Sequence, residues 1–409
     1  MLRAMIRAEG PLPFARFMEL ALYHPAYGYY CTRRVLSGPR GDFYTSPALH
    51  PAFGALLARQ VQEIWEQLGQ PTPFVVEEWG AGDGQLAADL LAAAPALAPA
   101  FGASLHYVIV ERSAALRRRQ QRRLRPWGAR VRWIASPEGE GQPAGGEAAP
   151  APAGLVGVVL ANELLDAFPV HRVVRRGNTL RELYVDLADD GFCTVEGEPS
   201  TPALAAYFAR LGFLPPEGAV AEVNLAALDW LRAVAARLER GVVLLLDYGH
   251  PAEVLYSARY PRGTLRAYYR HSLSVEPYYR VGWQDLTAQL DLTSLLLEGR
   301  AAGLLPLGLA RQRDFLRRLG LAAYERAVRA AGLPAAETQA SLNALAALVH
   351  PAGLGGHWVV GFGRGLSGPL QGLDEAATPL TGPALADFLR PRLGWEHPAP
   401  FSRGRRGQR

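Results

Sequence analysis

Two acids and an amide directly follow a buried apolar run, at Asn162, Glu163 and Asp166 in the stretch NELLDAFP. Glu163 and Asp166 are three residues apart, so one helical turn would place both carboxylates on one face. Paired carboxylates match a planar guanidinium group, which presents five N–H donors in a fork. We therefore predict that Glu163, Asp166 and Asn162 are catalytic residues acting on an arginine. A helix cap with acids in its first turn is the structural alternative.

A glycine-rich turn joins a predicted strand to a predicted helix in the stretch FVVEEWGAGDGQL. Its glycines are Gly80, Gly82 and Gly84, and bare backbone there lets a nucleotide-like ligand approach closely. The dinucleotide pattern G-x-G-x-x-G/A is nearly present, but a pyrophosphate would meet the carboxylate of Glu78. That carboxylate suits a ligand with an ammonium and a sulfonium, such as S-adenosyl-L-methionine. The turn thus favours a methyl donor, with a nicotinamide or flavin cofactor and a purely structural turn as alternatives.

Further polar residues follow other predicted strands. Because the carboxyl ends of parallel strands meet at one edge of a sheet, these residues should share one rim. Glu111 ends the stretch HYVIVE and could accept both ribose hydroxyls of a nucleoside. Asp247 and Tyr248 follow a later strand and are predicted to contact substrate. His250 lies beside them and could act as a base, although a lone histidine is more often incidental.

The stretch GDFYTS contains Asp42 and Thr45 and precedes a predicted helix. Ser46-Pro47 offers a helix N-cap followed by proline at the first helical position. We predict that Asp42 and Thr45 belong to a lid over the donor and the substrate. A tight turn capped by Ser46 is the alternative reading of the same residues.

An α/β sheet must position these side chains. Short apolar runs that alternate with helical stretches predict a parallel sheet covered by helices on both faces. The fold class is therefore α/β, with a Rossmann-like sheet at its centre. The predicted strands are 74–79, 106–110, 129–134, 155–161 and 242–247, with a closing strand at 357–365.

The chain has 409 residues, which is long enough to expect more than one subdomain. A stretch that alternates like a β-meander, followed by helical sequence, separates the fourth and fifth predicted strands. A low-complexity segment at 136–154 is predicted to be a flexible surface loop. The predicted units are a helical N-terminal extension with its lid loop (1–70), a Rossmann-like core with added helices (71–169 and 241–365), an inserted α+β substrate subdomain (170–240) and a C-terminal tail of doubtful order (366–409).

Composition excludes several kinds of site. The two cysteines, Cys31 and Cys193, are far apart, which excludes a cysteine zinc site, and we predict no metal. All 43 basic residues are arginine, so a lysine-based phosphate loop or Schiff base is excluded. The arginine-rich run 117–125 is predicted to be a solvated helix face, so nucleic acid is not an expected partner. The sequence has no secretory signal pattern and no apolar run long enough to span a membrane, which predicts a cytoplasmic protein.

These segments together resemble the MidA-like family, the group that contains the mitochondrial complex I assembly methyltransferase. The resemblance covers most of residues 12–365, and NELLDAFPVHR and DLTAxxDxT are its most specific motifs. Gln289 departs from the pattern, because a histidine is expected there in many relatives. The matching stretches are FMELALYHPAYGYY (17–30), GDFYTSPALHPAFG (41–54), VVEEWGAGDGQLAADLL (75–91), YVIVERSAALRRRQ (107–120), LANELLDAFPVHRV (160–173), LLLDYGH (244–250), GTLRAYYRH (263–271) and GWQDLTAQLDLTSL (282–295).

The resemblance implies a class I methyltransferase fold, S-adenosyl-L-methionine as the donor, and N-methylation of an arginine in a protein substrate. For the mitochondrial member that substrate is a subunit of respiratory complex I. Asn162 and Glu163 would line the reaction centre. The residues implied to hold the donor are Glu78, Gly80, Gly82 and Gly84 for its methionine part and Glu111 for its ribose.

Three other functions stay open at this point. An NAD-dependent oxidoreductase would use the same glycine turn. A non-catalytic assembly factor would keep the fold and bind a partner through its helices. A small-molecule or RNA methyltransferase is the third, although the N/D-P-P-Y/F pattern typical of enzymes acting on base amines does not follow the fourth predicted strand.

Overall fold

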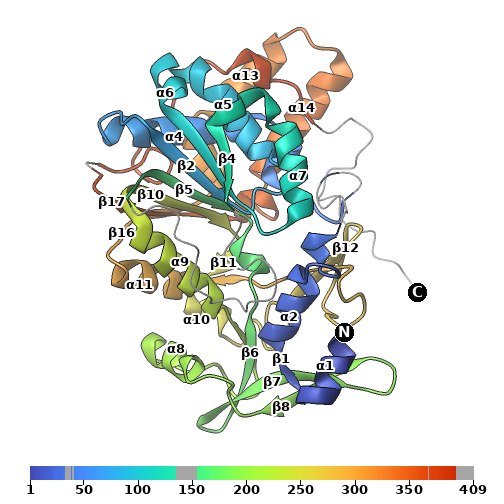
Figure 1. Cartoon of the computed structure of the whole chain (residues 1–409). Coiled ribbons are helices and arrows are strands. Elements are labelled where there is room, and N and C mark those ends of the chain that lie inside the picture. Colours follow the sequence, from blue (N-terminus) through green and yellow to red (C-terminus); the bar gives the residue numbers. More distant parts are fainter. Residues whose placement is uncertain (33–37, 39–40, 135–153, 367, 393–409) are drawn as a thin grey trace.

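The computed structural model describes residues 1–32, 38, 41–134, 154–366 and 368–392. A seven-stranded sheet crosses the upper half of the molecule, with helices on both of its faces (Figure 1). Its five parallel strands confirm the predicted α/β class, and two antiparallel strands extend one edge. In spatial order the strands are β16 (Leu305–Arg311), β17 (Trp358–Arg364), β10 (Leu238–Asp247), β5 (Leu155–Asn162), β2 (Phe74–Trp79), β3 (Leu105–Val110) and β4 (Val131–Ile134).

The predicted strands occur at or near their expected bounds. β4 begins two residues later than predicted, because residues Arg125–Arg130 form a 3-10 turn that contains Pro126. β10 begins four residues earlier than predicted. The edge strand β16 was not predicted, because the stretch LPLGLAR is short and carries both a proline and a glycine. Of the low-complexity segment, residues 135–153 lie outside the described part of the chain.

Both faces of the sheet are buried, because successive side chains of a strand point to opposite faces. Val158 and Leu160 of β5 pack into one hydrophobic core, and Val159 and Ala161 pack into the other. This explains why the strand reads as a continuous apolar run. The helices on the first face include α4 (Ala52–Gln67), α5 (Gln85–Leu97), α12 (Gln312–Arg318), α13 (Leu321–Ala330) and α14 (Ala335–Leu348). The helices on the second face include α8 (Ala203–Leu211), α9 (Leu225–Arg237) and α11 (Leu292–Ala301).

The N-terminal region is helical, as predicted, but its second helix is interrupted. The structure has a short helix α3 (Ser46–Leu49) and then α4, because His50 is extended and Pro51 precedes α4. The N-cap of α3 is Thr45 rather than Ser46. The first helices are α1 (Leu2–Glu9), which was not predicted, and α2 (Phe14–Tyr23).

A second sheet forms the lower half of the molecule (Figure 1). It contains the predicted meander, and it also takes in β1 (Leu12–Pro13) from the N-terminal region through pairing with β7. The predicted domain boundaries stay a prediction. The strands of this sheet are β6 (His171–Arg176), β7 (Thr179–Leu187), β8 (Phe192–Gly197) and β9 (Val220–Val223).

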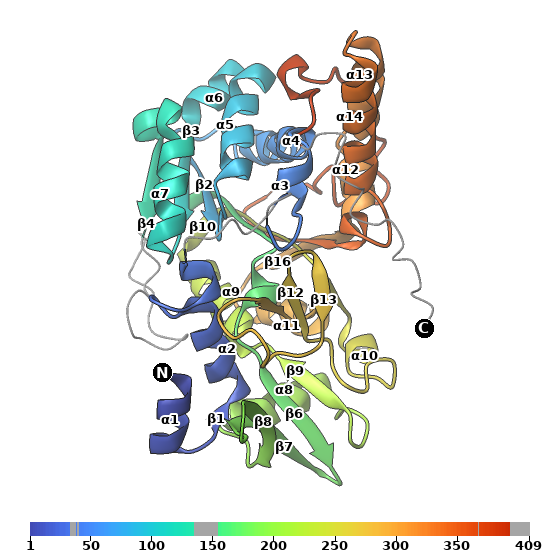
Figure 2. The ribbon, with the colours of Figure 1, turned by 90° about the vertical axis from the view of Figure 1, so that its right-hand side faces the viewer.

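A small third sheet lies between the two halves, as Figure 2 shows for β12 and β13. Its strands are β12 (Arg266–Tyr269), β13 (Ser272–Ser274) and β14 (Asp285–Thr287). The C-terminal tail was predicted to be of doubtful order; its residues Leu370, Leu373 and Phe388 are buried against the first core, and residues 367 and 393–409 lie outside the described part of the chain. In the described part of the chain, no helix has both the length and the apolar character needed to cross a membrane. The remaining elements are α6 (Pro99–Ser104), α7 (Ala114–Arg123), α10 (Ala252–Leu255), β11 (Gly249–His250) and β15 (Leu290–Asp291).

Candidate active site

The sequence-predicted polar residues gather along one edge of the main sheet. The chain runs outward through β2, β3 and β4 and then returns to the other side of β2 as β5. Ligands of open α/β sheets bind at such a reversal, beyond the carboxyl ends of the strands. The glycine turn follows β2, Glu111 follows β3, and Glu163 follows β5. The topology therefore places the predicted donor residues beside the predicted acceptor residues.

The backbone of the glycine turn has the conformation expected from its glycines. Gly80, Gly82 and Gly84 all have positive φ, at 66°, 53° and 80°, a region that favours glycine. Gly84 caps α5 in the left-handed conformation. From α7, Gln120 donates to the carbonyl of Gly82 at 2.9 Å, and Arg123 pairs with Asp83 at 2.7 Å. The arginine-rich run, predicted to be only a solvated face, thus supports this turn through Arg123.

Two buried acids flank the turn. The hydroxyl of Tyr107 donates to Glu78 at 2.7 Å, and burial raises the pKa of Glu78 to about 8. Glu111 accepts from the backbone N–H of Ser113 at 2.8 Å and from Gln120 at 2.9 Å. Burial raises the pKa of Glu111 to about 7. Neither acid faces bulk solvent, and both would be ionised more readily next to a cationic ligand.

This part of the rim fits an adenosyl sulfonium ligand. A Cβ built on Gly82 would meet no described atom within 4 Å, so the backbone there borders open space that glycine leaves free. Each oxygen of Glu111 accepts one hydrogen bond from the described residues, and a carboxylate oxygen has room for a second. Glu111 can therefore receive two ribose hydroxyls without losing its protein partners. Gly80 also packs closely, because a Cβ there would lie 2.6 Å from the Leu164 side chain.

A cavity of about 1180 Å³ opens at the carboxyl ends of β5 and β10, and none of the predicted donor residues is among its described lining residues. Its inner wall is acidic and aromatic and includes residues distant in sequence. The described residues contain no group of three His, Cys, Asp or Glu side chains arranged to hold a metal ion. The acidic and aromatic lining residues include Tyr30, Asp42, Glu163, Asp166, Tyr248, Tyr268 and Asp285.

Glu163 is held in an unusual conformation at this wall. Its φ is 49°, a region that non-glycine residues rarely adopt, and such strain is concentrated at functional sites. One oxygen, Oε1, accepts from the backbone N–H of Ser46 and from the amide of Asn162, each at 3.2 Å. Burial, and then the charge of Asp166, raise the pKa of Glu163 to about 8. The contact with Ser46 links Glu163 to the segment predicted to be a lid.

Asp166 and Asp247 have different surroundings although both follow β-strands. Asp247 accepts the backbone N–H groups of Leu165, Asp166 and Tyr248 at 3.1, 3.2 and 2.8 Å, so it shapes the turn after β5. Asp166 accepts from the hydroxyl of Tyr248 through Oδ2, while its buried Oδ1 has no partner among the described residues. Burial raises the pKa of Asp166 to about 6. Asp247 therefore holds the backbone that carries Asp166.

The sequence-based prediction missed Asp285, which opens the motif DLTAxxDxT. The hydroxyl of Tyr30 donates to Asp285 at 2.7 Å, and burial and then Asp166 raise its pKa to about 8. In the same segment, Thr287 Oγ1 and Gln289 Oε1 are buried and lack partners within the described residues. The resemblance already marked this motif as specific, so the signal was present in the sequence. The backbone N–H of Ala288 donates to the carbonyl of Asp166 at 2.9 Å and anchors the segment.

The predicted lid residues do not all face the cavity. Asp42 lines it but is committed to the protein, because it accepts from Tyr29 at 2.8 Å and from the backbone N–H of Arg270 at 2.6 Å. Thr45 caps α3 and is not among the described lining residues. The ring of Tyr44 stacks on His271, with centroids 4.6 Å apart. Asp42 therefore joins the lid to the 270–271 loop. His250 lines the same cavity and contacts Tyr260 at 2.8 Å.

A protein-family model matches residues 56–310 and is described as "Putative S-adenosyl-L-methionine-dependent methyltransferase". The mitochondrial protein arginine methyltransferase NDUFAF7 homolog of Drosophila melanogaster is 33% identical, over 71% of this chain and 67% of that protein. The mitochondrial protein arginine methyltransferase NDUFAF7 of Homo sapiens is 28% identical, over 77% of this chain and 71% of that protein. Family and relatives agree with the predicted methyl donor and exclude the nicotinamide reading.

Solved structures agree with the fold. A Burkholderia thailandensis protein crystallised with S-adenosyl-homocysteine is 34% identical, with a TM-score of 0.79 over 92% of this chain and 94% of that chain. A second crystal structure from the same organism has a TM-score of 0.76 with the same identity and coverage. The first structure shows that this fold accommodates the demethylated donor in a relative.

The comparisons overturn one prediction. The absence of a targeting pattern predicted a cytoplasmic protein, but the curated relatives from fly, rat and human are named mitochondrial. The prediction of a cytoplasmic location is therefore wrong. The prediction failed because it was inferred from the absence of a targeting pattern, and no residue of the folded protein supported it.

Proposed function

Because this chain belongs to the MidA-like family of S-adenosyl-L-methionine-dependent methyltransferases, we propose that its acidic cavity receives an arginine side chain of a protein and that the guanidinium group is methylated there. The methyltransferase class and the donor follow from the family. The arginine acceptor and the roles of individual residues are the proposal. Support comes from the names of the relatives and from the chemistry of the cavity wall.

Unpartnered acceptors in the cavity wall are the observation that carries the proposal. Asp166 Oδ1, Thr287 Oγ1 and Gln289 Oε1 are buried and unpaired within the described residues, and all three side chains line the cavity. Leaving a buried acceptor unpaired costs about 1–3 kcal/mol. A guanidinium brings five donors in a plane and would satisfy several acceptors at once. A phosphate-rich acceptor such as RNA would instead meet Glu163, Asp166 and Asp285 with charge of the same sign.

The proposed roles of the acids follow from their surroundings. The bound S-adenosyl-L-methionine would supply an electrophilic methyl group, held by Glu78, the glycine turn and Glu111. Glu163 and Asp166 would fix the guanidinium plane and localise its positive charge on the nitrogens that do not react. The reacting nitrogen would lose one proton as its new N–C bond forms and the methyl–sulfur bond of the donor breaks, leaving S-adenosyl-homocysteine. Glu163 is the proposed acceptor of that proton, since its raised pKa suits a base working near neutral pH.

The pH dependence of kcat/KM should follow these acids. The free enzyme must lose protons from Asp166 and Glu163, whose pKa values are about 6 and about 8, before it can bind a cation. We expect kcat/KM for an arginine substrate to rise with pH across this range and level off above about pH 8. Because the acids interact, the profile reports them as a group. A profile that falls over the same range would contradict a cationic substrate.

The proposal is tested by incubating the protein with methyl-labelled S-adenosyl-L-methionine and a cell lysate, then separating protein, nucleic acid and metabolites. Label in the protein fraction is expected. Label confined to nucleic acid or metabolites would replace the proposal with an RNA or small-molecule methyltransferase. Donor binding without label in any fraction would favour the non-catalytic assembly factor.

A subunit of respiratory complex I is the protein substrate that the family resemblance suggests. Nothing in the cavity identifies that subunit. Purified complex I subunits offered as acceptors with labelled donor should take up label in one subunit if the suggestion is right. Label in other lysate proteins, with none in any complex I subunit, would reject this substrate and keep the methyltransferase.

A further inference from the structure

The cavity that we propose for arginine also has a basic rim, formed by arginines among its lining residues. Arg259, Arg266 and Arg311 line the cavity together with the acids. Within the described residues, no carboxylate lies within ion-pairing distance of any of these three arginines. Glu163 and Arg311 lie at the ends of strands that β10 and β17 separate, so the fold keeps these two charges apart. We propose that the acceptor arginine lies in an acidic polypeptide segment and that Arg311 binds a carboxylate near it in sequence.

Arg311 is held in place for such a contact. Its guanidinium lies 3.6 Å from the centroid of the Trp358 ring, and its NH1 donates to the carbonyl of Gly356. The stacked, hydrogen-bonded geometry reduces the ordering cost of binding, and the remaining N–H donors suit a bidentate carboxylate. Burial, and then the charge of Arg313, lower the pKa of Arg311, and the charge of Asp314 offsets this only in part. Arg313 itself is paired with Asp314 at 3.3 Å.

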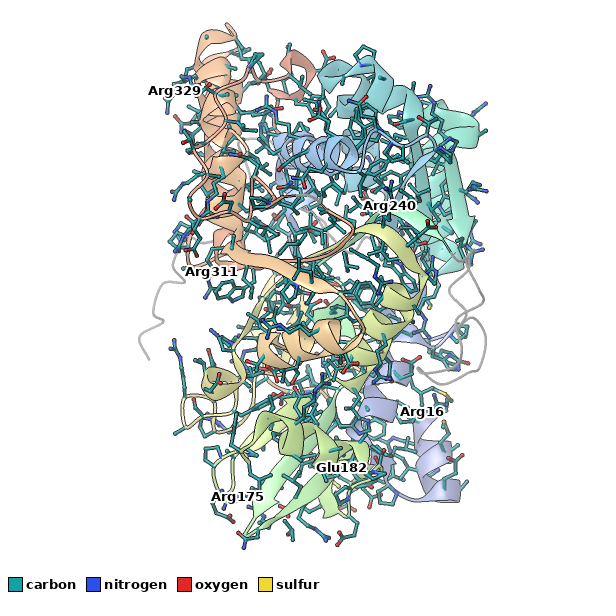
Figure 3. The ribbon with its side chains drawn as sticks, turned by 90° about the vertical axis from the view of Figure 1, so that its left-hand side faces the viewer. Arg16, Arg175, Glu182, Arg240, Arg311 and Arg329 are labelled. Atoms are coloured by element: carbon teal, nitrogen blue, oxygen red, sulfur yellow. The ribbon has the colours of Figure 1, made fainter. Side chains whose placement is uncertain are left out.

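The strand order gives the backbone spacing between the two charged residues. Glu163 follows β5, and Arg311 ends β16 at the same rim, separated by β10 and β17. Three strand intervals of about 4.8 Å amount to roughly 14 Å. An extended chain covers that distance in roughly four residues. Figure 3 shows Arg311 below the helices of the C-terminal half and well away from Arg329 on α13.

A polypeptide fits this arrangement better than free arginine. The α-carboxylate of free arginine could in principle reach a rim cation while its guanidinium meets the acids. The cavity of about 1180 Å³, however, exceeds the size of about 300–1,000 Å³ that encloses a drug-sized ligand. A chain segment with several residues would fill it. The inference rests on the proposed arginine acceptor and adds the sequence context of that arginine.

The test compares short synthetic peptides that share one arginine and differ only at the position roughly four residues away, on either side. That position carries Glu, Gln or Lys, and free L-arginine is a further arm. We expect wild-type protein to methylate the better Glu peptide at least about tenfold faster in kcat/KM than its Gln counterpart, and the Lys peptide most slowly. Arg311→Gln should remove the preference for Glu. Arg329→Gln, which changes an exposed arginine on α13, should keep it.

The outcomes separate this inference from the proposed function. Equal methylation of the Glu and Gln peptides by wild-type protein overturns the acidic context but leaves the arginine acceptor standing. Methylation of free L-arginine with none of any peptide overturns both. If Arg311→Gln does not fold, the wild-type peptide series still decides. Should Arg311→Gln fold and keep the full preference for Glu, the role of Arg311 is rejected.

Discussion

Glu163→Gln is expected to lose about a thousandfold in kcat while it binds S-adenosyl-homocysteine as tightly as wild type. The glutamine keeps the size of the side chain and can still accept from Ser46 and Asn162. It can neither carry negative charge opposite a guanidinium nor accept a proton at its working pH. Single-turnover kinetics and calorimetric titration with S-adenosyl-homocysteine measure the two effects separately. Loss of donor affinity with little change in kcat would move Glu163 into the donor site.

The same variant should be more stable than wild type near pH 8. Glu163 titrates near 4.5 when exposed, but burial and Asp166 raise its pKa to about 8 in the fold. Between those pH values the folded state binds more protons than the unfolded state, so this group lowers stability as pH rises. Glu163→Gln removes this loss of stability. The melting temperature of the variant should therefore exceed that of wild type at pH 8 but not near pH 4. Glu375→Gln, at an exposed position, should change neither activity nor this pH dependence.

Gly82→Val is expected to weaken S-adenosyl-homocysteine binding at least about a hundredfold, or roughly 2.7 kcal/mol. The side chain would enter the open space beside the turn, where no described atom lies within 4 Å of the position of Cβ. The backbone φ of 53° also strains a branched residue, so part of the effect is on folding.

Gly69→Val separates these two contributions. Gly69 follows α4, has a φ of 82° and likewise borders open space. Gly69→Val therefore has the same kind of backbone strain but lies outside the glycine turn proposed to bind the donor. Calorimetric titration and thermal melting should show reduced stability for both variants and lost donor binding for Gly82→Val alone. Normal affinity in a folded Gly82→Val protein would contradict donor binding at the glycine turn.

The predicted donor residues lie close together in the sequence, whereas the residues of the acceptor wall do not. Gly80, Gly82, Gly84, Glu78 and Glu111 lie in two short local segments, each a strand followed by its turn. Local patterns decide such segments, because the strand periodicity and the turn glycines are read directly from neighbouring residues.

The acceptor wall depends on contacts between distant segments. Tyr30 meets Asp285 across 255 residues, and Ser46 meets Glu163 across 117 residues. No local pattern encodes these approaches. The same reason explains Asp247, whose three backbone partners appear only when β10 lies beside β5. The basic rim was also missed, because β16 is an edge strand with a weak sequence signal.

Asp42 shows how tertiary contacts determine the role of a polar residue. Its position in GDFYTS predicted a lid residue that touches donor or substrate. In the fold both of its carboxylate oxygens accept from the protein, from Tyr29 and from the backbone of Arg270. It therefore joins the lid to the loop before β13, and any effect of Asp42→Asn should act through lid position.

Residue-level mass spectrometry of the methylated protein tests the central claim most directly. Lysate proteins labelled by wild-type protein and by Glu163→Gln, with a heavy methyl group on the donor, would be digested and sequenced by fragmentation. We expect heavy methyl groups on arginine side chains after treatment with wild type and none after treatment with Glu163→Gln. Heavy methyl groups only on other residue types, or equal arginine labelling by both proteins, would contradict a guanidinium acceptor held by Glu163.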